Sequence, residues 1–280
     1  MRVNIIKNVG CNPKKIKYRR NTEGFRDGDH SIKKDNNVTR ILVVGDSFTY
    51  GQGIKDETVI FPSLLEQYLN QIDTEKKYEV FNFGKPGSNL IDKILLLEKY
   101  GLKYQPDIVI IQHRCWFGDK ELQMRFGIKG KEFNYNTNSA FLYWLNYYGA
   151  RKIMSSKKLR KLQQYSWQLY NERSVFAQKA HTNCVQLQAL SKKYGFEILV
   201  VNFTWFPNAS HWPSRRQDAE SLNFITRISQ ENNFQFIDLY RSYQKYPPKK
   251  LRAHAFDSHP NILAHKIAAQ EIFDFLITSM

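Results

Sequence analysis

The chain has 280 residues, of which 42% are hydrophobic and 24% are charged, and its formal net charge at pH 7 is +16. This composition is that of an ordinary globular protein, and it excludes collagen-like, coiled-coil and intrinsically disordered chains. The positive charge is typical either of a basic, solvated surface or of a protein with an acidic partner, such as an anionic glycan or a membrane surface.

The sequence carries no signature of nucleic-acid binding, a structural metal or a membrane span. It has no RRM, KH, zinc-finger or helix-turn-helix motif, so nucleic acid is not an expected partner. Cys11, Cys115 and Cys184 are odd in number and far apart, which argues against a disulfide framework or a zinc site. Neither a long apolar run nor the apolar stretch of a signal peptide is present, so a cytoplasmic location is expected, with peripheral contact to a membrane surface as the alternative.

Residues 1–39 are polar and basic, with turn signals at Asn12-Pro13 and Glu23-Gly24, and they predict an irregular leader that wraps the domain formed by residues 40–280. Within that domain, short β-branched or aromatic runs predict buried strands. In chain order these are Ile41–Val44, Val80–Phe83, Ile108–Ile111, Ile198–Phe203 and Phe234–Leu239. Segments with helical apolar spacing lie between and after them, at Phe61–Ile72, Leu90–Tyr100, Val175–Lys193, Ala219–Glu231 and Leu263–Ile277.

Strands and helices alternate along the chain, which predicts an α/β fold with a parallel five-stranded sheet and helices on both faces. In such sheets, ligands bind beyond the carboxyl ends of the strands. Three polar turns follow the first three predicted strands, namely Gly45-Asp46-Ser47, Gly84 to Asn89, and Gln112-His113-Arg114. We therefore expect these turns to converge on one site.

The stretch from about residue 120 to 173 does not fit this repeat. It is aromatic and basic, as in Phe141 to Tyr148 followed by Lys157 to Lys161. We interpret it as a helical insertion between the third and fourth strands. It forms either a lid or basic interfacial surface over the site, or a helical cap that is buried by its own aromatic residues.

Ser47 stands at the end of a predicted strand, which would expose its hydroxyl. A serine hydroxyl becomes a useful nucleophile only when a base removes its proton and a third group orients that base. Asp257 and His259 lie two residues apart in a predicted loop before the last helix, which returns them to the edge of the sheet that carries Ser47. A Gly-Asp-Ser sequence alone is equally typical of a turn or a helix cap.

Three blocks of the sequence resemble those of the SGNH/GDSL hydrolases. The first is Arg40-Ile41-Leu42-Val43-Val44-Gly45-Asp46-Ser47-Phe48-Thr49-Tyr50-Gly51-Gln52-Gly53. The second is Asn82-Phe83-Gly84-Lys85-Pro86-Gly87, and the last is Asp257-Ser258-His259-Pro260-Asn261 with His265 and Ala268. The segment Asn21 to Asp27 is also similar to one that precedes the first strand in many bacterial members. The resemblance implies a flavodoxin-like three-layer α/β/α fold and leaves residues 120–195 uncovered.

Carried over by resemblance, Ser47 is the nucleophile and one main-chain oxyanion donor, Gly87 is a second donor, His259 is the base and Asp257 orients it. No metal or organic cofactor is implied. Two features depart from the family pattern. The closing block reads Asp-x-His rather than Asp-x-x-His, a form similar to that of acetyl-transferring relatives from bacterial polysaccharide assembly. The family also has a third block, after the third strand, that carries an oxyanion Asn; here that stretch, Gln112 to Asp119, has no Asn, and His113 or Arg114 is a candidate replacement.

The leading functional hypothesis is a serine esterase that hydrolyses a small acyl ester, such as an acetyl ester, of a carbohydrate or similar substrate. The first alternative is an O-acyltransferase that forms the same Ser47 acyl-enzyme but passes the acyl group to a sugar hydroxyl. The second alternative is a catalytically weak glycan-binding module, because the third-block Asn is missing. A thiol nucleophile at Cys115, beside His113, is a minor reading, since a cysteine next to an apolar strand is usually a buried small residue.

Overall fold

The computed structural model describes residues 16–72, 76–114, 175–204, 206–207, 209–212, 219–255 and 257–279. Its centre is a parallel five-stranded sheet in the order β2-β1-β3-β4-β5. The strands are β1 (Val38–Gly45), β2 (Lys77–Gly84), β3 (Ile108–Arg114), β4 (Glu197–Phe203) and β5 (Gln235–Asp238). This is the flavodoxin-like strand order, in which the chain reverses its direction of progress beside β1 and opens a crevice there.

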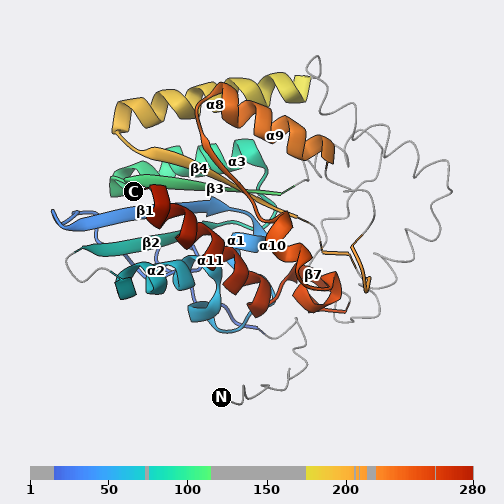
Figure 1. Cartoon of the computed structure of the whole chain (residues 1–280). Helices are drawn as coiled ribbons and strands as arrows, with labels where there is room; N and C mark the ends of the chain where they lie inside the picture. The colour runs from blue at the N-terminus through green and yellow to red at the C-terminus, as the bar shows by residue number, and fades with distance from the viewer. Residues whose placement is uncertain are drawn as a thin grey trace.

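Helices cover both faces of the sheet (Figure 1). One layer holds α3 (Leu90–Leu96), α8 (Val175–Tyr194) and α9 (Ala219–Glu231), and the other holds α2 (Phe61–Ile72) and α11 (Ile262–Ser279). Successive side chains of β1 serve opposite layers, as strand alternation requires. Leu42 and Val44 pack with the α3/α8/α9 layer, whereas Ile41 and Val43 pack with α2 and α11. The result is a three-layer α/β/α fold with a core on each side of the sheet.

The predicted fold class is confirmed, and the predicted strands and helices all coincide with observed ones to within a few residues. Two predicted loops prove to be regular structure. Gln112, His113 and Arg114 complete β3 instead of forming a turn after it, because they pair with Asn202 and its neighbours on β4. The segment with Asp257 and His259 is strand β7 (Asp257–Pro260), which pairs with β6 (Arg252–His254) as an antiparallel hairpin.

The described part of the leader, residues 16–37, contains no helix or strand, yet it is attached to the domain by a buried arginine. Arg26 is only 1% exposed. Its guanidinium donates to the carbonyl oxygens of Tyr50, Gly51, Ile54 and Lys55 at 2.6–3.2 Å. These carbonyls belong to the last residue of α1 (Ser47–Tyr50) and to the segment that follows it, so the leader fixes the chain next to Ser47.

We expect Arg26→Met to lower the free energy of unfolding by about 3 kcal/mol, because hydrogen bonds from a buried charged donor are worth more than neutral ones and their carbonyl partners would lose them. Urea unfolding followed by circular dichroism measures this change. Arg19→Met is the matched control, since the Arg19 side chain is largely exposed and its ion pair with Glu57 lies at the surface; its effect should stay within about 0.5 kcal/mol. Equal effects of the two substitutions would contradict the role given to Arg26.

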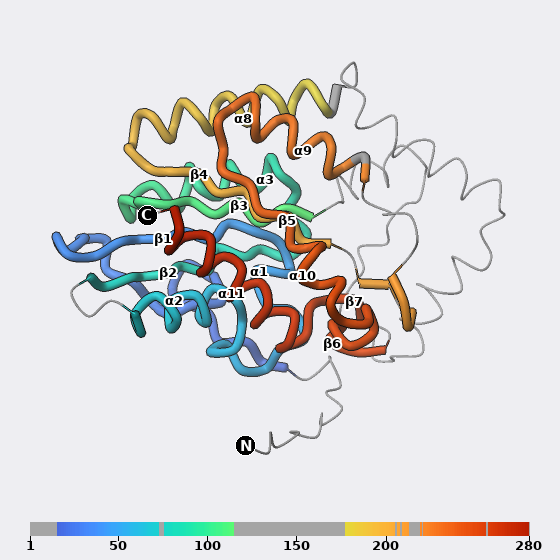
Figure 2. Tube along the Cα trace, viewed as in Figure 1, coloured from blue at the N-terminus to red at the C-terminus, as the bar shows by residue number. Residues whose placement is uncertain are grey.

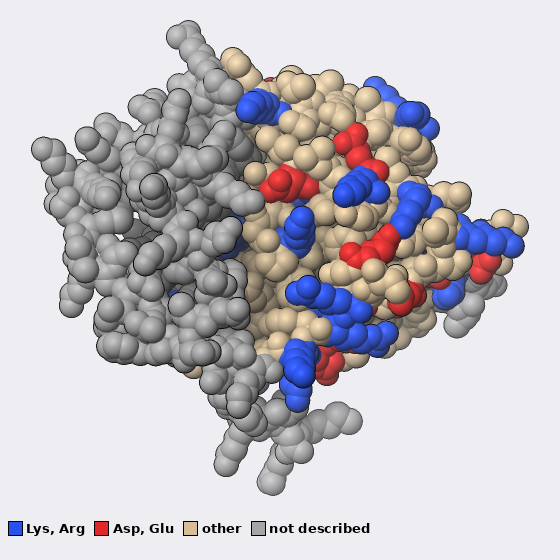
Figure 3. All heavy atoms as spheres, turned by 180° about the vertical axis from the view of Figure 1, so that it is seen from behind, with Lys and Arg blue, Asp and Glu red and all other residues tan. Residues whose placement is uncertain are grey.

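Several predictions fall on residues outside the described ranges. These are the insertion at about 120–173, residues 1–15 of the leader, and Cys115. Within the described part of the chain, each helix is too short or too polar to traverse a lipid bilayer. On the face seen in Figure 3, basic side chains are interspersed with acidic ones and do not form one continuous basic patch.

Candidate active site

Ser47 lies where β1 ends and α1 (Ser47–Tyr50) begins. The Asp46 carboxylate caps this short helix by accepting the Phe48 N–H at 2.8 Å. Gly45 is required here for space: a Cβ at this position would stand 1.8 Å from the Thr49 hydroxyl oxygen. The tight passage from strand to helix therefore depends on the Gly-Asp-Ser sequence, and it places Ser47 at the carboxyl edge of the sheet.

The β6–β7 hairpin brings the other two candidate residues to the same edge (Figure 2). Arg252 holds its turn by donating to the carbonyl oxygens of Ala255 at 3.1 Å and of Asp257 at 3.4 Å. Residues two apart on a strand point to the same face. Asp257 and His259 on β7 can therefore bond to each other, which gives the Asp-x-His spacing a structural reason.

Ser47, His259 and Asp257 are joined by hydrogen bonds. The Ser47 Oγ lies 3.0 Å from His259 Nε2, and His259 Nδ1 lies 2.5 Å from Asp257 Oδ1. The same carboxylate oxygen accepts the His259 main-chain N–H at 3.0 Å. The edge of the imidazole packs against the Phe48 ring, with centroids 5.6 Å apart. The structure thus brings together the three residues that the sequence singled out, in the order serine, histidine, aspartate.

The electrostatics of the carboxylate suit a group that orients a histidine. Burial alone would raise the pKa of the Asp257 carboxyl, but the hydrogen bonds and charge of His259, with help from Arg252, outweigh burial and hold that pKa below its ordinary value. Asp257 is therefore ionised at neutral pH and accepts the Nδ1 proton, which leaves Nε2 to face Ser47.

Gly87, the second candidate oxyanion donor, lies in the turn between β2 and α3. Its φ is +81°, a left-handed conformation that favours glycine, and a Cβ there would meet open space. Asn89 then caps α3 by accepting the Asp92 N–H at 2.8 Å. Gly87 is exposed at the carboxyl edge of the sheet, so its main-chain N–H lies on the same side of the sheet as Ser47.

His113 and Arg114, the two candidates for the missing third-block donor, have partners of their own. His113 is buried, and its Nε2 lies 3.2 Å from Ser221 Oγ on α9. Burial, together with the charge of Lys93, lowers the pKa of His113 to about 3, so the ring is neutral at physiological pH. Arg114 Nε lies 3.3 Å from Asp46 Oδ2, and its guanidinium stacks 4.6 Å above the Phe48 ring.

The sequence analysis placed Gln112 near the site but gave it no role, and it did not single out Lys93; both side chains are buried beneath the Gly-Asp-Ser turn. Lys93 Nζ donates to the Gln112 carbonyl oxygen at 2.6 Å, and burial lowers the pKa of its ammonium group to about 8 in spite of the nearby Asp46 carboxylate. Burial has the opposite effect on the Asp46 carboxyl and would raise its pKa. The positive charges of Arg114 and Lys93 outweigh burial, so the pKa of Asp46 is lowered. Nothing in a single sequence marks Lys93, because it lies on a helix among apolar residues, and nothing shows which main-chain groups the Gln112 side chain meets.

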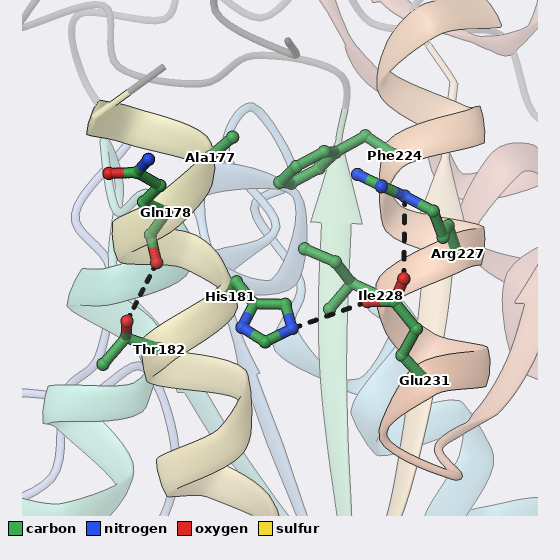
Figure 4. A pocket seen from close by; sticks show the side chains of 8 residues that line it. All are labelled: Ala177, Gln178, His181, Thr182, Phe224, Arg227, Ile228 and Glu231. Atoms are coloured by element: carbon green, nitrogen blue, oxygen red, sulfur yellow. Dashed lines mark hydrogen bonds and ion pairs between the residues drawn. The ribbon is translucent and has the colours of Figure 1, made fainter. Parts of the chain in front are cut away.

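A separate groove of about 400 Å³ lies between α8 and α9 (Figure 4). His181 on α8 faces Glu231 on α9 at 3.6 Å, and Arg227 lies 4.0 Å from the same carboxylate group. None of Ser47, Asp257 and His259 lines this groove. Among the described residues, no group of three or more His, Cys, Asp or Glu side chains is arranged to hold a metal ion.

Comparisons with known proteins place the fold. No protein-family model matches the chain, and no curated protein matches it in sequence. Solved structures that it resembles include the acetyl xylan esterase AlAXEase, at 16% identity, with 84% of this chain and 98% of that chain covered and a TM-score of 0.50. Axe2, an acetylxylan esterase from Geobacillus stearothermophilus, is 16% identical over 84% and 93% of the two chains, with a TM-score of 0.53. TesA is 13% identical over 85% and 98%, with a TM-score of 0.53. The chain shares the fold of these proteins.

Proposed function

We propose that this protein is a serine esterase of the SGNH/GDSL type, with Ser47 as the nucleophile, His259 as the base and Asp257 as the residue that orients the base. The observation that carries the proposal is the continuous hydrogen-bonded chain from Ser47 Oγ through the imidazole to the Asp257 carboxylate, at 3.0 and 2.5 Å. Such a chain removes the hydroxyl proton and stabilises the imidazolium that results. The sequence blocks around these residues, which resemble those of the family, support the same assignment.

In the proposed reaction, the Ser47 oxygen attacks the ester carbonyl carbon while His259 Nε2 takes the hydroxyl proton. The same proton then passes to the departing alcohol, which leaves an acyl group on Ser47. A water molecule, deprotonated by His259, hydrolyses the acyl-enzyme and restores the serine. The negative charge on the carbonyl oxygen is met by main-chain N–H groups, for which we propose those of Ser47 and Gly87.

The proposed substrate is a small acyl ester, with acetyl first, on a carbohydrate or similar hydroxyl compound. The titles of two similar structures name acetyl xylan esterases, which supports an acetylated saccharide. The net charge of +16 supports a glycan that carries negative charge. On the face drawn in Figure 3, acidic residues lie among the basic ones, so on that face the attraction would come from the summed charge and not from one patch.

An O-acyltransferase remains the second candidate, favoured by the Asp-x-His spacing of Asp257 and His259. Both functions share the Ser47 acyl-enzyme and differ only in the group that accepts the acyl chain. The ratio of acetylated saccharide to free acetate, measured with an acetyl donor and a sugar acceptor present, separates the two. An excess of transfer over hydrolysis at millimolar acceptor would establish the transferase.

The direct test combines labelling with turnover. A fluorophosphonate probe should modify Ser47, as mapped by peptide mass spectrometry, and acetylated xylo-oligosaccharides should be deacetylated faster than esters of long-chain acids. Saccharide binding without labelling and without turnover would instead establish a glycan-binding module.

A separate experiment tests whether His113 replaces the oxyanion Asn that is missing after the third strand. Because His113 is buried, bonded to Ser221 and neutral at physiological pH, we expect His113→Leu to change kcat by less than about tenfold, whereas loss of a side-chain oxyanion donor costs about 10²–10³-fold. Hydrolysis rates of p-nitrophenyl acetate decide between the two. A loss of 10² or more in kcat, with an unchanged melting temperature, would make His113 the missing donor.

A further inference from the structure

A buried side chain on β3 is bonded to the turn that carries Ser47. Gln112 is 0% exposed. Its Oε1 accepts the main-chain N–H of Asp46 at 2.9 Å and the hydroxyl of Thr49 at 3.3 Å. One amide oxygen therefore holds the residue before Ser47 and a residue in the short helix that follows.

The pairing of β1 with β3 places the Gln112 amide beside Asp46. The main chains of β1 and β3 pair from Ile41 with Ile108 to Val44 with Ile111. Asp46 lies beyond the last of these pairs, where β1 leaves the sheet, and the Gln112 side chain supplies an acceptor that the main chain of β3 no longer gives. Gly45 makes this approach feasible, since a Cβ at residue 45 would lie 2.7 Å from Gln112 Oε1.

Charged groups bond to the main chain of Gln112 and to the neighbouring Asp46. Lys93 donates to the main-chain oxygen of Gln112, while Arg114 faces the Asp46 carboxylate. The three side chains of Asp46, Lys93 and Gln112 are all buried. A neutral amide suits this position, because an ionised carboxylate at residue 112 would set a second buried negative charge beside that of Asp46.

We propose that Gln112 is a positioning residue that holds the Asp46–Thr49 turn so that Ser47 Oγ stays within hydrogen-bonding distance of His259 Nε2. The inference rests on the proposed function of Ser47. It predicts a particular kinetic effect, since a displacement of about 1 Å at a reacting group can cost on the order of 10²-fold in rate while substrate contacts elsewhere remain. The effect should therefore appear in kcat and not in KM.

The test uses Gln112→Met, which has a similar shape but offers no oxygen acceptor, in the full chain with p-nitrophenyl acetate. We expect kcat to fall by about 10- to 100-fold and KM to stay within about twofold. Gln188→Met is the matched control, because Gln188 donates to the Asn232 carbonyl far from Ser47; its kcat should equal that of the wild type.

Thr49→Val covers the case in which Gln112→Met does not fold. It removes the second donor to the same oxygen. As a single variant it should lower kcat, and in combination with Gln112→Met it should lower kcat little further. A kcat of Gln112→Met within about twofold of the wild type would overturn the inference while the esterase proposal stood. A wild-type protein that is neither labelled at Ser47 nor active on acetyl esters would instead overturn the esterase proposal itself.

Discussion

Ser47→Ala is expected to lower kcat for p-nitrophenyl acetate by about 10⁴- to 10⁶-fold, the usual cost of removing the nucleophile from a serine–histidine–aspartate site. The loss is this large because the acyl-enzyme cannot form, so only unassisted attack by water remains. The protein should still fold, since the substitution deletes one oxygen from a residue that is 6% exposed and, among the described residues, removes its bond to His259. The measurement is the initial hydrolysis rate, together with loss of fluorophosphonate labelling.

Ser229→Ala provides the matched control. Ser229 is also a buried serine, but it lies on α9, where its hydroxyl donates to the Ile225 carbonyl. Its removal should leave kcat unchanged. Retained activity in Ser47→Ala together with lost activity in Cys115→Ala would contradict the assignment and make the thiol the nucleophile.

The sheet and the position of its site could be predicted because their signals are local. Short apolar runs such as Ile41–Val44 and Ile108–Ile111 mark buried strands, and helical segments between them require parallel pairing. Parallel pairing in turn places every strand's carboxyl end at one edge. Ser47 follows β1 directly, so its place at that edge needed no knowledge of tertiary contacts.

The β6–β7 hairpin could not be predicted, because its strands contain only three and four residues. A strand of that length is too short for a periodic pattern to develop. The expected loop at Asp257 and His259 was therefore wrong, although the pairing of these residues with Ser47 did not depend on it. The strand explains what the sequence left open, namely why one residue and not two separates Asp257 from His259.

The structural roles of Gln112 and Arg26 were missed for a different reason. Gln112 bonds to residues 63 and 66 positions earlier in the chain, and Arg26 bonds to carbonyls 24 to 29 positions later. Each bonds to at least one main-chain group of a distant segment, and a main-chain group is the same whatever residue carries it, so the sequence does not reveal such a contact. A buried polar side chain must have a hydrogen-bond partner, but the sequence does not show which group that partner is. Its structural role can therefore be assigned only from the structure.

Asp257→Asn is expected to lower kcat by about 10⁴-fold with little change in structure, because an amide can donate to Nδ1 and so favour the tautomer in which Nε2 bears the proton. His259 could not then accept the proton of Ser47. The loss should persist at every pH from about 5 to 9. Since the pKa of Asp257 is held below its ordinary value, the wild-type carboxylate keeps its charge throughout that range and loses it only when the pH falls below the range.

Asp274→Asn is the matched control, as Asp274 lies on the exposed face of α11 and bonds only to side chains of the same helix in the described structure. Its pH–rate profile should superimpose on that of the wild type. The decisive quantity is the ratio of wild-type to Asp257→Asn kcat across the pH range. A ratio below about 10 at any pH would mean that His259 is oriented without the carboxylate, whereas a constant ratio near 10⁴ requires the ionised Asp257 on Nδ1.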